Sequence, residues 1–147
     1  MRSLLDRLTR RLKVSTTPRS PAIWIDLFGK QACAPHDLPA TVRRIDQFAA
    51  QEKCRITLVL VQRPSDRAGH ALHPRHATLR AVESPDDRGK LFLKESRALT
   101  RQQGVIITGD ADLEKLLAPS GVPLMRYSTF EKALNLAAQN PTADAPS

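Results

Sequence analysis

The chain has 147 residues, a length typical of one domain, and 41% of them are hydrophobic, which excludes a wholly disordered protein. Aromatic residues make up only 4%, so we expect an aliphatic core. No apolar run is long enough to cross a bilayer, and the longest, residues 56–61, suits a buried strand. The two cysteines, Cys33 and Cys54, provide neither a disulfide framework nor a metal site, and a cytoplasmic location is expected.

The net charge of +8 is concentrated in two segments. Residues 1–20 carry six Lys or Arg against one Asp, residues 62–80 carry four Arg against one Asp, and the remaining charges cancel. Such localised charge favours a polyanion as partner, nucleic acid first and an anionic membrane surface second; solvation of flexible segments is the simpler alternative. The basic residues expected to contact nucleic acid are Arg7, Arg10, Arg11, Lys13, Lys30, Arg63, Arg67 and Arg75.

Residues 1–20 are interpreted as a basic arm that precedes the folded domain. A short helix over this arm would carry an apolar side made of Leu4, Leu5, Leu8 and Leu12. The arm lacks the continuous apolar stretch of a secretory signal, which leaves an organelle-targeting segment, a membrane-surface helix or an RNA-contacting arm. Residues 139–147 are polar and contain proline, and we expect a disordered tail there.

Strands and helices alternate through residues 21–138, the expected domain. The predicted strands cover residues 22–27, 55–61, 77–82, 104–108 and 123–126. The predicted helices cover residues 38–52, 84–103, 110–118 and 128–138, and their starts are marked by Asp37, by Ser84 with Pro85, and by a capping box of Ser128 and Glu131. This alternation predicts a three-layer α/β/α fold around a short parallel sheet of about five strands.

Acidic residues gather where three of the predicted strands end. Asp26 ends the first strand, Asp110 directly follows the fourth, and Asp86 and Asp87 open the helix after the third. In an open parallel sheet, ligands bind beyond the carboxyl ends of the strands at the point where the winding reverses. Asp26 and Asp110 are therefore expected to converge if the first and fourth strands are neighbours.

Carboxylates that share a small site need a counter-charge, or some of them must be protonated. A Mg²⁺ or Mn²⁺ ion held by carboxylates and water is the usual device for phosphodiester hydrolysis. Asp87 is preferred over Asp86 as a third member, because it lies on the expected core-facing stripe of its helix with Leu91, Glu95 and Ala98. The candidate catalytic residues are Asp26, Asp87 and Asp110, and the candidate metal ligands are Asp26, Asp86, Asp87, Asp110 and Asp112.

Each acid also has a structural explanation. Asp110 can cap its helix, and Asp112 can complement the helix dipole. Ser84 with the two acids that follow Pro85 makes a complete helix start. Asp26 is the hardest to explain in this way, because a charge in an apolar strand needs a partner.

At these residues the chain resembles the PIN-like nuclease superfamily, in particular its NYN branch. Residues 23–29 resemble the first strand motif of that branch, with Asp26 in the aspartate position, and residues 106–110 resemble its Thr-Ser-Asp element. Residues 84–87 match its acidic helix start, and residues 121–130 match its closing pattern. The resemblance implies a metal-dependent ribonuclease that cleaves RNA phosphodiesters with a carboxylate-bound Mg²⁺ or Mn²⁺ ion.

Two departures from the family pattern weaken the implied activity. Gly29 takes the place of the expected asparagine, and the second predicted strand ends in Gln62 and Arg63 where an acid is common. The alternative is a catalytically degenerate PIN-like domain that binds RNA or a ribonucleoprotein. A third alternative is an interaction or membrane-surface protein that docks through its N-terminal helix.

Three histidines, His70, His73 and His76, recur at three-residue spacing in the second basic segment. Pro74 interrupts any helix that could align them on a metal, so we expect a solvated or RNA-facing loop. The sequence contains no phosphate-cradling glycine loop. A receiver domain is excluded, because Asp26 has no second acid beside it and Arg126 stands where a lysine is needed.

Overall fold

The computed structural model describes residues 21–28, 38–62 and 73–139, and confirms the α/β expectation. Within these ranges five strands form one all-parallel sheet in the order β3-β2-β1-β4-β5. The strands are β1 (Ala22–Asp26), β2 (Arg55–Val61), β3 (Thr78–Val82), β4 (Val105–Thr108) and β5 (Leu124–Arg126). The helices are α2 (Leu38–Glu52), α3 (Pro85–Arg101), α4 (Ala111–Leu117) and α5 (Tyr127–Gln139), with a short 3₁₀ turn, η3 (Ala118–Ser120).

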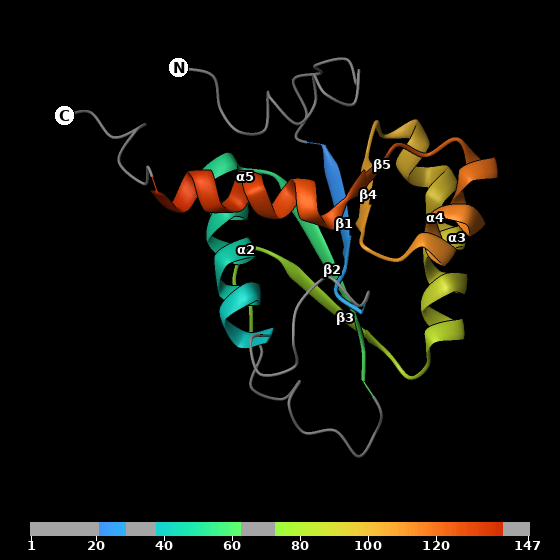
Figure 1. Ribbon diagram of the computed structural model, residues 1–147, viewed down its shortest axis with the longest axis horizontal. Helices are drawn as coiled ribbons and strands as arrows, with labels where there is room; N and C mark the ends of the chain where they lie inside the picture. Colours follow the sequence, from blue (N-terminus) through green and yellow to red (C-terminus); the bar gives the residue numbers. More distant parts are fainter. Residues whose placement is uncertain (1–20, 29–37, 63–72, 140–147) are drawn as a thin grey trace.

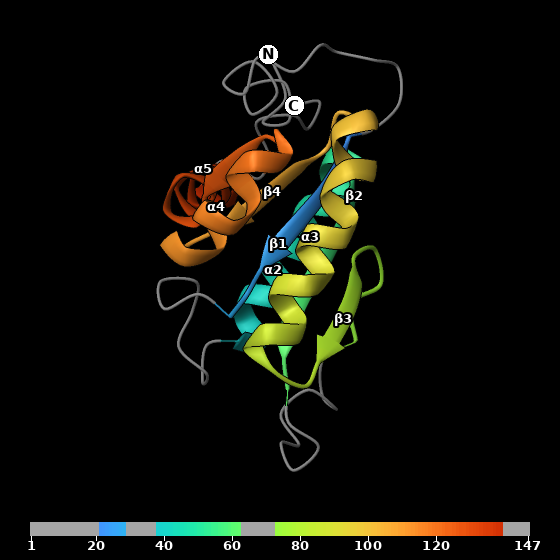
Figure 2. The same cartoon turned by 90° about the vertical axis from the view of Figure 1, so that its right-hand side faces the viewer.

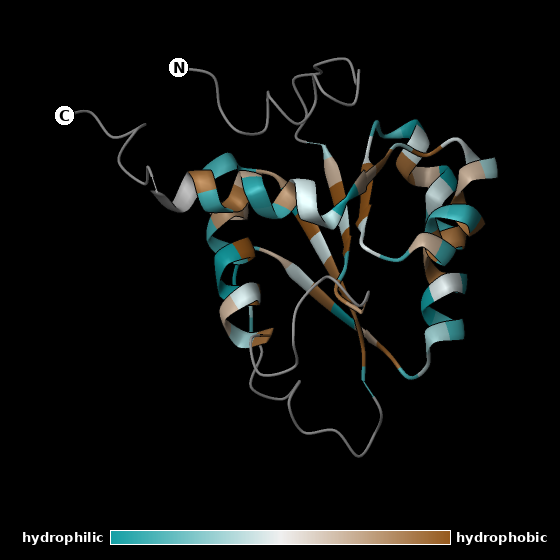
Figure 3. Cartoon of the chain, in the orientation of Figure 1, coloured by the Kyte–Doolittle hydropathy of each residue, from teal (hydrophilic) through white to brown (hydrophobic). Residues whose placement is uncertain are grey.

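The sheet is the middle of three layers (Figure 1), with α2 and α5 on one face and α3 and α4 on the other. Successive strand side chains point to opposite faces. Ile23 and Ile25 therefore belong to the core under α2 and α5, whereas Trp24 and Asp26 face α3 and α4. The strands are the most hydrophobic segments and the outer helix faces are polar (Figure 3), as a two-sided core requires.

The winding of the sheet reverses between β1 and β4. The chain adds β2 and then β3 on one side of β1, and α3 then crosses the sheet to place β4 on the other side. Figure 2 shows α3 running along the sheet. Ile25 of β1 pairs with Ile107 of β4, so the carboxyl ends of these two strands lie next to each other. The condition for Asp26 and Asp110 to converge, that the first and fourth strands are neighbours, is therefore met.

Two helices end on left-handed residues that are not glycine. Lys53 has φ 52° after α2, and Gln103 has φ 57° after α3. In each case the next N–H bonds back into the helix, from Cys54 to Ala49 and from Gly104 to Leu99, which closes the helix and leads directly into a strand.

The predicted start of the last helix is wrong by one residue. The helix α5 begins at Tyr127, directly after β5, so Ser128 lies inside its first turn and not at the N-cap. The Ser84 start is confirmed, because the Ser84 side chain accepts a hydrogen bond from the N–H of Asp87. None of the described helices is both long and apolar enough to span a bilayer.

Candidate functional site

Asp26 and Asp110 meet at the point where the winding of the sheet reverses. Asp26 is the last residue of β1 and its side chain is fully buried, while Asp110 is the N-cap of α4 directly after β4. The sequence analysis expected this convergence only if the two strands were neighbours, and the register of β1 and β4 shows that they are. Both acids, however, meet around a third residue that the sequence did not single out.

That residue is Arg88, in the first turns of α3. Its Nη1 lies 2.7 Å from Asp26 Oδ2, and its Nη2 lies 2.6 Å from Asp110 Oδ2. The guanidinium therefore bridges the two carboxylates. The Arg88 side chain is only 7% exposed, and the ring of Phe28 covers it at 4.7 Å from the ring centroid. We call Asp26, Arg88, Thr108 and Asp110 the acid–arginine cluster.

Hydrogen bonds occupy the remaining oxygens of both acids. Asp26 Oδ1 accepts from the N–H of Phe28 at 3.0 Å, and Asp26 Oδ2 also accepts from Thr108 Oγ1 at 2.7 Å. Asp110 Oδ1 accepts from the N–H of Asp112 at 2.9 Å, which is the helix cap. Thr108 Oγ1 in turn accepts from the N–H of Asp110 at 3.0 Å. The cluster is thus a connected network in which every carboxylate oxygen already has a donor.

The charges of the cluster stabilise one another. Hydrogen bonding to Arg88 holds the pKa of Asp110 below its usual value, against the opposing effect of burial. Burial by itself would lower the pKa of Arg88, but the hydrogen bonds and charges of Asp110 and Asp26 outweigh it and raise the pKa. Arg88 Nε is buried without a hydrogen-bond partner in the described part of the chain, which costs free energy.

The expected third acid does not join this cluster. Asp86 and Asp87 are both exposed in the first turn of α3. The buried face of α3 is formed by Arg88, Gly89, Phe92, Ser96 and Leu99. The predicted core-facing stripe through Asp87 was therefore wrong by about one residue, or 100° around the helix. Asp112 is exposed on α4 and contributes only its backbone N–H to Asp110.

A divalent cation does not fit the cluster as it is arranged. Among residues 21–28, 38–62 and 73–139, no three His, Cys, Asp or Glu side chains are grouped closely enough to hold a metal ion. The two acids that do meet share a guanidinium as their counter-charge, in place of the divalent cation expected from the sequence. A Mg²⁺ or Mn²⁺ ion would need the same oxygens that Arg88 occupies.

Most of the basic residues expected to contact nucleic acid lie outside the described residues: Arg7, Arg10, Arg11, Lys13, Lys30, Arg63 and Arg67. The same holds for Cys33, Asp37 and His70. Arg75 is described and exposed. The Asp46 carboxylate of α2 fixes the backbone there, because it accepts from the N–H groups of Arg75, His76 and Ala77 at 3.1, 2.7 and 2.8 Å.

Comparison with known proteins gives no assignment: no family model, no curated protein and no solved structure matches this chain. The family resemblance therefore rests on the residues alone. Of those residues, Asp26, Thr108 and Asp110 lie together in the acid–arginine cluster. Arg88, which completes it, directly follows the acidic helix start of residues 84–87.

Proposed function

We propose that this chain is a PIN-like domain of the NYN type that does not cleave RNA and acts as an RNA-binding module. The observation that carries the proposal is that the Arg88 guanidinium bridges Asp26 and Asp110, with one nitrogen on each carboxylate. A metal-dependent nuclease needs a cation there that also activates water. A guanidinium binds both carboxylates and offsets one of their two negative charges, but it has no open coordination position, so it supports the fold and not the hydrolysis.

The charge of the chain supports RNA as the partner. The chain carries a net charge of +8. Residues 1–20 and 62–80 account for all of this excess, and the positive and negative charges of the other residues balance without it. Phosphate contacts from Lys and Arg supply most of the free energy of sequence-independent binding, and they make that binding depend on salt. An RNA-binding role uses the positive charge without requiring the acids to do chemistry.

The second candidate is a metal-dependent ribonuclease. It is favoured by one observation, the placement of Asp26 and Asp110 at the ends of neighbouring strands where the winding reverses. For this activity Arg88 must leave both carboxylates before an ion can bind. The two candidates therefore differ in a measurable way, because only the ribonuclease requires a metal ion to replace Arg88 at the two carboxylates.

The deciding experiment incubates the full chain with end-labelled single-stranded RNA in millimolar Mn²⁺, and compares wild type with Asp26→Asn and Asp110→Asn. The expected result is that wild type binds the RNA and cleaves it no faster than either variant. Cleavage by wild type that disappears in both variants would overturn the proposal in favour of the ribonuclease. An absence of RNA binding up to high micromolar protein would remove the RNA-binding role itself.

Deletion of residues 1–20 tests the contribution of the arm. The arm carries six Lys or Arg, so its removal should weaken RNA binding and flatten the dependence of log K on log salt. For a single strand, the slope decreases by about 0.7 for each phosphate that the protein no longer neutralises. An unchanged slope would assign the arm to another partner.

A further inference from the structure

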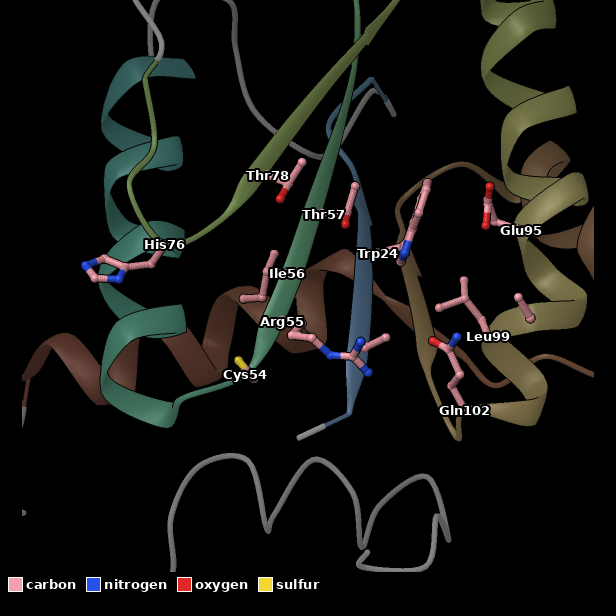
Figure 4. Close-up of a pocket in the computed structure, with 12 residues that line it drawn as sticks. Trp24, Cys54, Arg55, Ile56, Thr57, His76, Thr78, Glu95, Leu99 and Gln102 are labelled. Atoms are coloured by element: carbon pink, nitrogen blue, oxygen red, sulfur yellow. The ribbon is translucent and has the colours of Figure 1, made fainter. Parts of the chain in front are cut away.

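A groove of about 340 Å³ lies on the α3 side of the sheet, away from the acid–arginine cluster. It is placed toward the amino ends of the strands, since Ala22 and Arg55, the first residues of β1 and β2, both line it. The opposite wall is the side of α3 that carries Glu95, Ala98, Leu99 and Gln102. Figure 4 shows the indole of Trp24 between its own strand β1 and this side of α3.

The edge position of β3 keeps the groove open. Among the described strands β3 is the last on its side of the sheet, and its residues Thr78 and Arg80 are exposed on the face that α3 only partly covers. Trp24 of β1, Thr57 of β2 and Thr78 of β3 are paired in register, so they form one row across the sheet beneath the groove. The row combines one aromatic ring with two hydroxyl groups.

Trp24 offers a platform for a planar ligand. Its ring is held from one direction by an edge-on contact with Phe92, at 6.0 Å between centroids and 72° between planes. The guanidinium of Arg80 lies over the indole, 5.8 Å from the centroid. Aromatic rings and guanidinium planes are the two surfaces on which proteins stack unpaired bases.

The walls carry groups that can recognise the edge of a base. Thr57 and Thr78 supply hydroxyls from the sheet, and Gln102 supplies an amide from α3. Glu95, the acid among the lining residues, can accept a hydrogen bond from an exocyclic amino group. Hydroxyl, amide and carboxylate groups around an aromatic floor suit a nucleobase better than an aliphatic or lipid ligand.

A line of positive charge borders the groove along α3. Lys90, Lys94, Arg97 and Arg101 are all exposed and follow one another at spacings of four, three and four residues, so they share one side of the helix. The line is about 16 Å long. Ala98, at the outer edge of the groove wall, is four residues from Lys94 and three from Arg101, so the line lies on the outer side of α3 next to this edge of the groove. We call these four residues the α3 basic line.

The α3 basic line is free to bind an external anion. None of its four members makes an ion pair within the described part of the chain. On the other side of the groove lie Arg55 and Arg80, both exposed. Positive side chains therefore flank an aromatic groove on two sides, which is the arrangement that binds single-stranded nucleic acid by its backbone and stacked bases together.

We propose that single-stranded RNA binds across this groove, with its phosphates along the α3 basic line and one unpaired base against Trp24. The inference rests on the proposed RNA-binding function and adds a surface outside both the N-terminal arm and the acid–arginine cluster. A base within a duplex is stacked and paired, so it cannot enter the groove, and the site is specific for single strands.

Trp24 makes the proposal directly measurable, because it is the only tryptophan in the chain. The full chain is titrated with a twelve-nucleotide oligouridylate, and indole fluorescence is followed beside the anisotropy of the same RNA carrying a fluorescein label. We expect quenching of the indole that saturates together with the anisotropy. A blunt RNA duplex of equal length should produce much less quenching at equal occupancy.

Two charge variants test the phosphate contacts. Lys94→Gln/Arg97→Gln removes two charges from the α3 basic line, and Arg43→Gln/Lys132→Gln removes two exposed charges from α2 and α5 on the opposite layer. The first variant should lower the salt slope by about 1.4, since each phosphate neutralised on a single strand contributes about 0.7. The control variant should keep the wild-type slope. Both variants retain Trp24, so the fluorescence readout is preserved.

Trp24→Leu, which keeps an apolar side chain against Phe92, should weaken RNA binding at least about fivefold because the base can no longer stack. RNA binding without indole quenching, or equal slopes in the two charge variants, would overturn this inference and leave the RNA-binding function standing. No RNA binding by wild type would overturn the RNA-binding function and this inference together.

Discussion

Arg88 and Asp26 form an ion pair with 2.7 Å between Nη1 and Oδ2, and the Asp26 side chain is completely buried. A pair of this kind adds little stability in comparison with well-packed apolar residues, but removal of one member leaves the other charged and buried. Substitutions of Arg88 therefore test two separate effects of this residue, one on the free energy of unfolding and one on the binding of a metal ion.

Arg88→Met should destabilise the protein by about 3–5 kcal/mol, because it leaves Asp26 without its counter-charge. Urea unfolding followed by circular dichroism measures the change. The double variant Asp26→Asn/Arg88→Met should recover a large part of this stability, since the buried charge is gone. The N–H of Phe28 can still donate to the asparagine oxygen, and the asparagine NH2 group, in the place of Oδ2, can donate to Thr108 Oγ1. Equal destabilisation in both variants would contradict the ion-pair explanation.

Mn²⁺ should stabilise Arg88→Ser and leave wild type unchanged. Serine removes the guanidinium and frees Asp26 Oδ2 and Asp110 Oδ2 for a cation. A ligand that binds only the folded state adds about 2.7 kcal/mol when its concentration is a hundred times Kd. Thermal melts with and without millimolar Mn²⁺ check this, with Ca²⁺ as a second ion. A comparable shift in wild type would mean that Arg88 already exchanges with a metal ion.

Acid should selectively weaken the attachment of residues 75–77 to α2. Burial alone would raise the pKa of Asp46, but the backbone N–H groups of Ala77, His76 and Arg75 outweigh it and hold the pKa below its usual value. The carboxylate therefore contributes stability above about pH 4, and this contribution disappears as the pH falls through the folded-state pKa.

The comparison of wild type with Asp46→Asn isolates this effect. The difference in free energy of unfolding should be largest near pH 7 and should shrink below about pH 4, because the wild-type carboxyl then becomes neutral as well. Urea titrations at pH 7, 5 and 3 provide the measurement. A difference that does not depend on pH would show that the amide itself disturbs the site and that charge plays no part.

Of two glycine-to-alanine changes, Gly104→Ala should destabilise the protein and Gly89→Ala should leave its stability nearly unchanged. At Gly104 a Cβ would lie 2.7 Å from the backbone oxygen of Ala22, so Gly104→Ala should force β1 and β4 apart and cost about 1–3 kcal/mol. At Gly89, inside α3, a Cβ would approach only the flexible end of Leu116 at 3.3 Å, and the gain in helix propensity offsets this contact. Thermal melts of the two variants measure the difference in their stability. Similar destabilisation in both would rule out the clash with Ala22 as the cause.

The thiol of Cys54 should be inert in the folded protein. Burial, and then the charge of Glu52, raise its pKa to about 12, and the residue is only 6% exposed. In a Cys33→Ser background, iodoacetamide at pH 8 should modify Cys54 in urea but not in native buffer, as judged by intact mass. Rapid modification of the native protein would mean that the end of α2 opens readily.

The strands could be predicted because their hydropathy is local. Residues 55–61, for example, are apolar enough to be recognised without any knowledge of their partners, and β2 has these bounds. The convergence of Asp26 and Asp110 could be stated only conditionally, because it depends on β1 and β4 being neighbours, and the strand order comes from the structure. Local patterns were less informative at the last helix. The capping box predicts a start at Ser128, but α5 begins at Tyr127, directly after β5.

Arg88 could not be predicted in the same way. The buried face of α3 contains an arginine, a glycine and a serine beside Phe92 and Leu99, so its hydropathy pattern is weak and the neighbouring stripe through Leu91 and Ala98 looked equally suitable. An arginine is buried only where its partners are, and Asp26 lies 62 residues earlier in the chain. Arg88 reaches Asp26 only in the folded structure, in which α3 connects β3 to β4 and packs against the sheet.

The central position of β1 has a consequence for biosynthesis. One edge of β1 pairs with β2, but its other edge has no partner until β4, beginning at Val105, has been made. An apolar strand with an open edge invites wrong pairing with other chains, and pairing with a distant segment is slow. During that interval Asp26 lacks Thr108, and until α3 packs on the sheet it lacks Arg88 as well, so its carboxylate stays hydrated. We expect this charge to act as a gatekeeper that protects the nascent sheet from aggregation until the ion pair conceals it.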